Sequence, residues 1–337
     1  MDAQPLRFIL AGQFRRDYLL PPTAAPFVEV PGGNLLYAAA GMSLWEQGIG
    51  LLGRIPTDYP PDWLEKMRLC GLDTRGIRPV QEEVDVRLFI TQDEAGEAAF
   101  DNPVARFAQA GHPFPKGLLG YRETLPTLDS RTRLGPLSIR LADIPVDFLD
   151  AAAAHICPVD YLTHSLLPPA LRQGHITTLT LDPSPGYMNP VFFNNIPALL
   201  SSLTAFLTTE NKLRSLFQGR STDPLEMAEA LAEYGCELII IRRGTQGQIV
   251  YESAAHRGWH IPAYPGRRFN PTGAGDAFCG GFLAGWRASY DPIQAALQGN
   301  ISASIVIESC DPFYAFNSMP GLAQARLEAL KERITPL

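Results

Sequence analysis

The residues best suited to chemistry lie in a glycine-rich stretch from Asn270 to Trp286, with the sequence NPTGAGDAFCGGFLAGW. Its second half has the apolar spacing of a helix. Each glycine inside a helix costs up to about 1 kcal/mol relative to alanine, so a helix rich in glycine needs a reason to keep it. Close approach of the backbone to another group is such a reason. We therefore expect a helix that begins near Gly273 and borders a ligand.

The first turn of that helix could bind an anion and move a proton. The N–H groups of Gly273, Ala274 and Gly275 would lack partners within the helix. Together with the positive end of the helix dipole, they would form an anion site. The same field would keep Asp276 ionised, so that it could take a proton from a hydroxyl group while the N–H groups hold a phosphoryl group. The alternative from these residues alone is a glycine turn in which Asp276 is a simple cap.

The elements that must position this stretch alternate between strands and helices. Short apolar runs predict buried strands, and wider apolar spacing predicts helices between them. The predicted strands are 6–11, 48–52, 155–158, 176–182, 205–208 and 237–241, and the predicted helices are 34–45, 61–69, 166–173, 190–201 and 223–234. Asp223 is expected to cap the last helix. This alternation predicts an α/β fold with a mostly parallel central sheet flanked by helices.

Two other segments have a different pattern. Residues 14–30 are polar and contain prolines, whereas 84–91 and 98–101 read as a hairpin around the polar turn Asp93–Glu97. We expect these parts, approximately 13–30 and 82–102, to form a small β lid inserted in a single domain that spans residues 1–337. Residues 103–140 are rich in Pro, Gly and Arg and are expected to be irregular.

Composition excludes several classes of protein. Hydrophobic residues make up 46% of the 337 residues and charged residues 19%, which is typical of a folded chain. The formal net charge of -7 and the absence of a Lys/Arg run argue against nucleic acid as the main partner. The five cysteines form no CxxC pair, and no apolar stretch reaches the ~18–20 residues that cross a bilayer. We expect a cytoplasmic protein with no membrane segment and no signal peptide.

The glycine-rich stretch resembles the signature of the PfkB/ribokinase carbohydrate kinases, D-[TP]-T-G-A-G-D-x-F followed by a glycine-rich helix. The resemblance implies a three-layer ribokinase-like fold with a small β lid. It implies transfer of the γ-phosphoryl group from ATP with Mg²⁺ to a hydroxyl of a sugar or sugar-like molecule. Asp276 would be the catalytic base, and Gly273, Ala274 and Gly275 the anion hole.

The resemblance extends to the acceptor side near the N-terminus. Family members place an acid after the first strand to bind sugar hydroxyls, and Asp17 is similar in position. A glycine pair then lines the substrate pocket, here Gly32-Gly33, and the following Asn34 is a further candidate. The family has Asn four positions after the pair, where this chain has Tyr37. Taken alone, the glycines could form a plain turn and Asp17 could be a solvated surface acid.

The nucleotide side is similar but altered. The segment LIIIRRGTQG, residues 238–247, is similar to the family strand followed by T-x-G-x-x-G, with Gly244 and Gly247 in place and Arg242 at the threonine. The guanidinium group could bind phosphate oxygens or lie at a solvated strand end. Asn300 matches a position that borders the nucleotide in relatives, although it could be an ordinary amide on a helix surface.

Two metal-related segments depart from the family pattern. The N-x-x-E segment aligns with 209–212, where Thr209 is a candidate nucleotide contact, Glu210 is a candidate Mg²⁺ ligand and a lysine replaces the acid. The family signature begins with Asp, and this chain has Asn270 at that position. Asn270 and Thr272 are candidate ligands for a K⁺ ion. Asp182 ends a predicted strand and is either a pocket wall or part of a turn without a ligand role.

The acceptor is a sugar or sugar-like molecule in this interpretation. Two alternatives stay open: a nucleoside kinase, in which Tyr37 stacks on a base, and a catalytically silent relative that binds a sugar. The lids of this family often pair between subunits, so a homodimer through the lid is also open.

Overall fold

The computed structural model describes most of the chain. The predicted turn Asp93–Glu97 lies outside the described residues. The described residues are 6–22, 24–92, 98–123, 128–331, 333 and 335–336. No helix among them is both long enough and apolar enough to cross a membrane.

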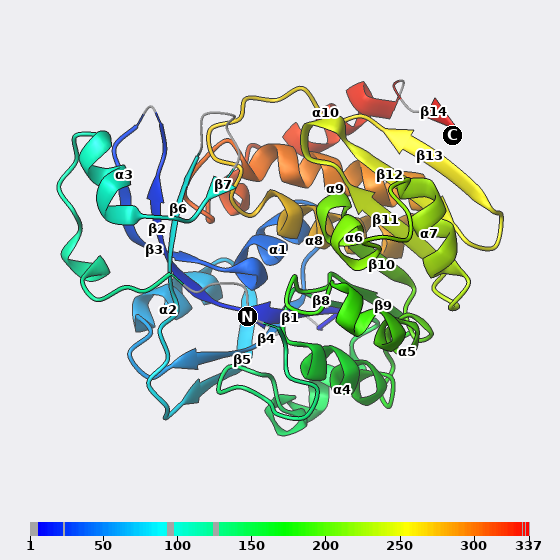
Figure 1. Cartoon of the computed structure of the whole chain (residues 1–337), viewed down its shortest axis with the longest axis horizontal. Helices are drawn as coiled ribbons and strands as arrows, with labels where there is room; N and C mark the ends of the chain where they lie inside the picture. The colour runs from blue at the N-terminus through cyan, green and yellow to red at the C-terminus, as the bar shows by residue number, and fades with distance from the viewer. Residues whose placement is uncertain are drawn as a thin grey trace.

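A large sheet forms the centre of the molecule (Figure 1). Within the described residues it has ten strands in the order β14-β13-β12-β11-β10-β9-β8-β1-β4-β5. The strands are β1 (Phe8–Gln13), β4 (Ile49–Pro56), β5 (Leu72–Val80), β8 (Ala153–Ile156), β9 (Thr178–Leu181), β10 (Ala205–Thr209), β11 (Leu238–Arg242), β12 (Gln248–Glu252), β13 (Arg257–Ile261) and β14 (Thr335–Pro336). All neighbouring pairs from β5 to β11 are parallel, which confirms the predicted mostly parallel sheet. Strands β12, β13 and β14 at one side of the sheet pair antiparallel, and this part of the sheet was not predicted.

Alternating side chains of the strands face two separate helical layers, because successive residues of a strand point to opposite sides of the sheet. In β11, Ile239 and Ile241 pack into one core cluster, whereas Leu238 and Ile240 pack into another. The first layer contains α4 (Tyr161–Leu171), α5 (Ile196–Leu200), α6 (Glu210–Leu216) and α7 (Pro224–Ala232), and the second contains α1 (Asn34–Ser43), α2 (Pro61–Leu69), α8 (Ala274–Ser289), α9 (Pro292–Val306) and α10 (Leu322–Lys331). The three-layer α/β fold predicted from the sequence is therefore confirmed.

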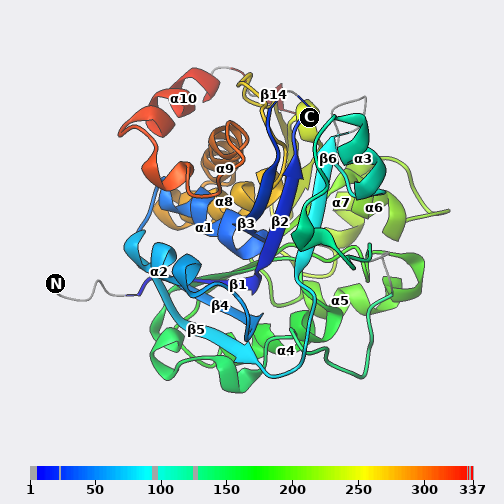
Figure 2. The ribbon, with the colours of Figure 1, turned by 90° about the vertical axis from the view of Figure 1, so that its left-hand side faces the viewer.

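A second, smaller sheet lies beside the carboxyl ends of the central strands (Figure 2). Its order is β3-β2-β6-β7, with β2 at Arg15–Leu20, β3 at Phe27–Gly32, β6 at Arg87–Gln92 and β7 at Ala98–Ala99. β6 and β7 pair antiparallel, as predicted for a hairpin, and β2 pairs antiparallel with β3 and parallel with β6. Only the buried Phe14 separates β1 from β2, so the two sheets are joined at the end of the first central strand.

Some elements differ from the sequence predictions in extent. The region 103–140 was expected to be irregular, yet it begins with α3 (Pro103–Gln109). α4 begins at Tyr161, five residues before the predicted start, because the Asp160 carboxylate accepts a hydrogen bond of 3.0 Å from the N–H of Thr163. The predicted helix 190–201 is a 3-10 turn at Pro190–Asn195 followed by α5. Asp223 caps α7 as predicted.

Candidate active site

Helix α8 begins where the sequence predicted, immediately after Gly273. Gly273 has φ 77°, in the left-handed region that favours glycine. A Cβ atom at this position would lie 2.2 Å from Cγ of Tyr37, so the Tyr37 ring packs directly on the glycine backbone. The glycine is therefore required both by its backbone angle and by this contact.

The first turn of α8 supplies free donors, although not all of those expected. The N–H of Ala274 donates a hydrogen bond of 3.2 Å to the carbonyl of Pro271 and is thus already used. The N–H groups of Gly275 and Asp276 have no acceptor among the described residues. An anion placed here would meet these two donors at the positive end of a 16-residue helix.

Asp276 is half-buried in that turn, and its carboxylate has no hydrogen-bond partner among the described residues. Burial raises its pKa to about 7, with Asp182 adding to the rise and Arg242 and Lys212 opposing it. The helix field was expected to keep this carboxylate ionised, but loss of hydration is the larger effect. A carboxyl group that titrates near neutral pH is suited to accept and release a proton.

Arg242 is tied into the protein on every nitrogen atom of its guanidinium group. Nη1 donates to the carbonyl of Gly275 at 2.5 Å, Nη2 donates to Oδ2 of Asp182 at 2.6 Å, and Nε donates to the carbonyl of Thr208 at 3.3 Å. The side chain is 9% exposed. The alternative of a solvated strand end is therefore wrong. The sequence also predicted that this guanidinium group donates to phosphate, but its nitrogen atoms already donate to acceptors within the protein.

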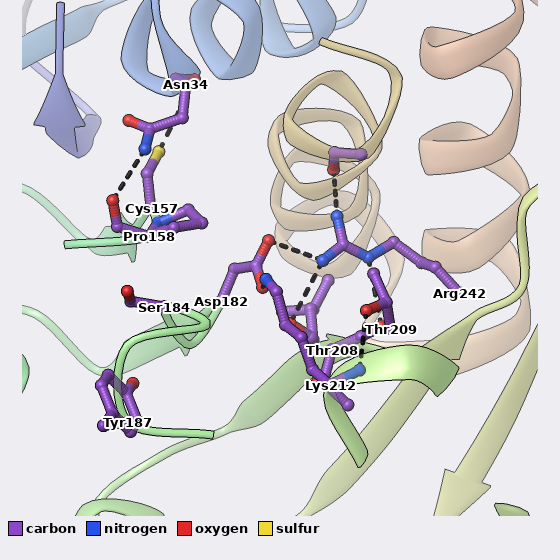
Figure 3. Close-up of polar contacts among 12 residues, drawn as sticks. Asn34, Cys157, Pro158, Asp182, Ser184, Tyr187, Thr208, Thr209, Lys212 and Arg242 are labelled. Carbon is purple, nitrogen blue, oxygen red and sulfur yellow. Dashed lines mark hydrogen bonds and ion pairs between the residues drawn. The ribbon is translucent and has the colours of Figure 1, made fainter. Parts of the chain in front are cut away.

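Asp182 lies between two cations at the carboxyl end of β9 (Figure 3). Lys212 Nζ donates to Oδ1 at 2.7 Å, while Arg242 takes Oδ2. Burial works to raise the pKa of Asp182, but Arg242 and Lys212 bring it below its usual value. Since two cations face one carboxylate, the cluster leaves a positive charge near Asp276. Asp182 was expected to be either a pocket wall or part of a turn without a ligand role, and Lys212 was noted only because it stands where the family has an acid.

Asp17 lies on β2 of the second sheet, near enough to Asp276 for the two charges to interact. It is 1% exposed, and a Cβ atom on Gly32 would lie 1.9 Å from its Oδ2 atom, so the carboxylate rests on the glycine backbone. Burial raises the pKa of Asp17 to about 7; Arg15 opposes the rise and Asp276 adds to it. The solvated-acid alternative for Asp17 is therefore wrong. The fold brings Asp17, Gly32, Tyr37 and Asp276 together from four separate segments.

Asn34 and Gly33 have structural contacts at the start of α1. The Asn34 side chain accepts from the N–H of Gln13 at 2.8 Å and donates to the carbonyl of Pro158 at 2.7 Å (Figure 3). Gly33 has φ 98°, and a Cβ atom there would lie 2.4 Å from the carbonyl oxygen of Gln13. These contacts join α1 to β1 and to the loop after β8, and they occupy both ends of the Asn34 amide.

The candidate nucleotide residues gather near the turn between β11 and β12. Gly244 and Gly247 have φ 57° and 83°, as a tight glycine turn requires. Asn300 is 5% exposed, so it is not an ordinary amide on a helix surface. Its Oδ1 atom accepts from the N–H of Tyr264 at 3.0 Å and its Nδ2 atom donates to the carbonyl of Pro262 at 2.8 Å. Asn300 thus fixes the segment that follows β13.

The candidate metal residues do not form a metal site of their own. Glu210 pairs with Arg214 and with Arg243, the latter at 2.8 Å, and hydrogen bonding to Arg243 lowers its pKa. Thr209 caps α6 by accepting from the N–H of Lys212. Among the described residues, no group of three or more His, Cys, Asp or Glu side chains could hold a metal ion.

The proposed K⁺ position fits a cation poorly. Oδ1 of Asn270 accepts from both the N–H and the hydroxyl of Thr272, the latter at 2.8 Å. Its Nδ2 atom donates to Sγ of Cys310 at 3.3 Å. The amide oxygen is thus satisfied within the protein.

A cavity of about 580 Å³ lies away from these residues, between the β2–β3 turn, the end of β6 and α3. Leu20, Thr91, Arg106 and His112 are among its lining residues, and Asp276 is not. It is therefore separate from the candidate site.

Comparison with known proteins agrees with this fold. The family described as "pfkB family carbohydrate kinase" matches residues 165–312, which include Asp182, Lys212, Arg242 and Asp276. The chain is similar to a 5-dehydro-2-deoxygluconokinase of Lacticaseibacillus casei, at 32% identity over 88% of this chain and 86% of the relative. It is similar to a cytidine kinase of Thermococcus kodakarensis, at 25% identity over 83% of this chain and 88% of the relative.

Solved structures share the fold. An Escherichia coli protein described as a ribokinase II, in complex with ATP and Mg²⁺, matches with a TM-score of 0.70 at 15% identity, over 96% of this chain and 99% of that chain. The fold and these similarities define a kinase of sugars or nucleosides. The chain belongs to the PfkB family of carbohydrate kinases, as the signature at 270–286 indicated.

Proposed function

We propose that this kinase transfers the γ-phosphoryl group of ATP to a hydroxyl group of a sugar or sugar-like molecule, with Asp276 as the general base. The observation that carries the proposal is the position of Asp276 in the first turn of α8, unpaired and with a pKa raised to about 7. The Escherichia coli structure in complex with ATP and Mg²⁺ supports ATP as the donor, and Mg²⁺ would be part of that substrate.

The geometry suits an in-line transfer. Asp276 would take the proton of the acceptor hydroxyl while the acceptor oxygen forms a bond to the γ-phosphorus. The bond between the γ-phosphorus and the bridging oxygen would break, and ADP would leave with its electrons. The free N–H groups of Gly275 and Asp276 would hold the oxygens of the transferring group. The positive charge left by Lys212 and Arg242 beside Asp182 would favour phosphate in the same place.

The second sheet is proposed to act as a lid. Asp17 on β2 belongs to it, and Gln92 Nε2 at the end of β6 donates to the carbonyl of Phe269, next to the signature. Closing this sheet over the acceptor would exclude water, which otherwise competes for the phosphoryl group. A homodimer formed through this sheet is part of the same proposal, and sedimentation velocity measures it.

The test is release of ADP from ATP with a panel of acceptors: D-ribose, D-fructose, 5-dehydro-2-deoxygluconate and cytidine. ADP release is expected with at least one of them. The similarity to a cytidine kinase makes a nucleoside the second candidate acceptor. The Tyr37 ring is packed on Gly273, so stacking of this ring on a base is not what favours that candidate. Binding of ATP without ADP release for any acceptor would contradict the proposal.

A further inference from the structure

Three buried oxygen atoms near the candidate base have no hydrogen-bond partner among the described residues. They are Oδ1 of Asp17 and the hydroxyl groups of Tyr37 and Tyr59. The three residues are 1%, 4% and 4% exposed. Leaving a buried polar group unpaired costs about 1–3 kcal/mol, and the great majority of such groups in folded proteins have a partner. Three together therefore require an explanation.

The three groups come from β2, α1 and the loop before α2, and contacts join these segments. Phe14, next to β2, packs on the Tyr59 ring, and Arg16 of β2 pairs with Asp58. Asp17 rests on Gly32, which lies just before α1. The charge of Asp17 raises the pKa of both Tyr37 and Tyr59, after the larger effect of burial. The charge of Asp276 acts on Tyr37 and on Asp17 as well. Asp17 is thus common to both tyrosines, and the cluster extends toward the candidate base.

Packing holds each of the three side chains in place. Asp17 rests on Gly32, and the Tyr37 ring rests on Gly273. The Tyr59 ring packs between Phe14 and Trp63, with ring centroids 5.8 Å and 5.3 Å away.

Tyr187 is a useful contrast. It is fully buried too, but its hydroxyl is 2.6 Å from Nδ1 of His164. At Tyr187, therefore, the protein itself supplies the partner of a buried tyrosine hydroxyl. The unpaired hydroxyls of Tyr37 and Tyr59 are fixed in position with their hydrogen-bonding capacity unused, which is how a binding site is preorganised.

We propose that the hydroxyl groups of Tyr37 and Tyr59 join Asp17 in binding hydroxyl groups of the acceptor. The carboxylate accepts hydrogen bonds from acceptor hydroxyls, and each phenol donates or accepts. The acceptor class is therefore a molecule with several hydroxyls on neighbouring carbons, either a free sugar or the ribose of a nucleoside. This inference rests on the proposed function only in placing the reacting hydroxyl of the same molecule at Asp276.

The test compares Tyr59→Phe and Tyr37→Phe with Tyr187→Phe. Each change removes one hydroxyl and keeps the ring. Binding of D-ribose, D-fructose and cytidine is measured without nucleotide, from the rise in melting temperature that each causes, and KM and kcat are measured with ATP. Tyr59→Phe is expected to raise the acceptor KM about tenfold, the value of one hydrogen bond, with kcat within about twofold. Tyr37→Phe is expected to raise that KM to a similar extent.

The stability of the unliganded protein separates a binding role from a structural one. Because the hydroxyls of Tyr37 and Tyr59 are unpaired, their removal is expected to leave the melting temperature unchanged or higher. Tyr187→Phe is expected to lower it and to leave the acceptor KM unchanged.

Equal acceptor binding by wild type, Tyr59→Phe and Tyr37→Phe would overturn the proposal, as would a wild-type protein that binds none of the three probes. If acceptor binding depends on Tyr59 but no ADP is ever released, this assignment stands and the proposed function fails.

Discussion

Nη1 of Arg242 donates a hydrogen bond of 2.5 Å to the carbonyl oxygen of Gly275. Arg242 is the last residue of β11, and Gly275 lies in the first turn of α8. The contact therefore joins the carboxyl end of a central strand to the helix that carries Asp276. The same guanidinium group holds the buried carboxylate of Asp182. The position of the candidate base is thus set by a charged cluster whose members come from three different strands and helices.

Replacing Arg242 by methionine should destabilise the protein strongly. The change leaves Asp182 with Lys212 alone and frees the Gly275 carbonyl, and breaking a buried ion pair costs about 3–5 kcal/mol. Urea unfolding measures the loss. Arg75→Met is the control, since Arg75 is likewise ion-paired, to Asp73 and Asp147, but its side chain is 59% exposed. It should cost less than about 1 kcal/mol. Equal losses in the two variants would refute the role of the buried cluster.

Gly273→Ala should disturb both folding and catalysis. The new Cβ atom would lie 2.2 Å from Cγ of Tyr37, so the ring or the start of α8 has to move. Gly219→Ala is a matched control, because Gly219 has φ 76° with nothing within 4 Å of a Cβ atom. Both variants carry the cost of a left-handed alanine, about 1–2 kcal/mol. The contact with Tyr37 should add at least about 2 kcal/mol for Gly273→Ala. A difference near zero would show that the ring does not need the glycine.

The two acids should make both stability and activity depend on pH. Burial raises the pKa of Asp17 and of Asp276 from 3.8 to about 7. Between these values the folded state binds more protons than the unfolded state, so the contribution of each acid to stability is lost as pH rises from about 4 to about 7. Asp276→Asn removes this effect.

The free energy of unfolding of Asp276→Asn minus that of wild type should therefore be larger at pH 8 than at pH 5, because only wild type loses stability as the acid ionises. For the active enzyme, kcat/KM should fall as pH drops below about 7, because the base must be ionised to take a proton. The apparent pKa of this fall belongs to Asp17 and Asp276 as a coupled pair and not to Asp276 alone. A pH-independent stability difference would contradict the raised pKa of Asp276.

Local signals predicted much of the fold. The start of α8 at Ala274 and the helix α2 at Pro61–Leu69 follow from glycine position and apolar spacing, which depend on neighbours in the chain. The parallel pairing of β2 with β6 could not be read in this way, because the two strands lie about 70 residues apart in the sequence and neither pattern specifies its partner.

The site was predicted unevenly for the same reason. Asp276 was identified because its turn has a recognisable sequence. The roles of Arg242 and Asp182 depend on an ion pair across 60 residues, which composition and spacing do not reveal. Tyr59 was missed altogether, since a tyrosine after a loop gives no sign that its hydroxyl will be buried and unpaired.

The most direct measurement of the central claim is the rate of ADP release by Asp276→Asn with a productive acceptor and saturating ATP. The value of kcat is expected to fall by a factor of about 10²–10⁴, with ATP binding close to wild type. Asp223→Asn is the control, because asparagine also caps a helix and Asp223 lies at the start of α7; its kcat should match wild type. An Asp276→Asn protein that is folded, binds ATP and turns over at the wild-type rate would contradict the assignment of Asp276 as the base.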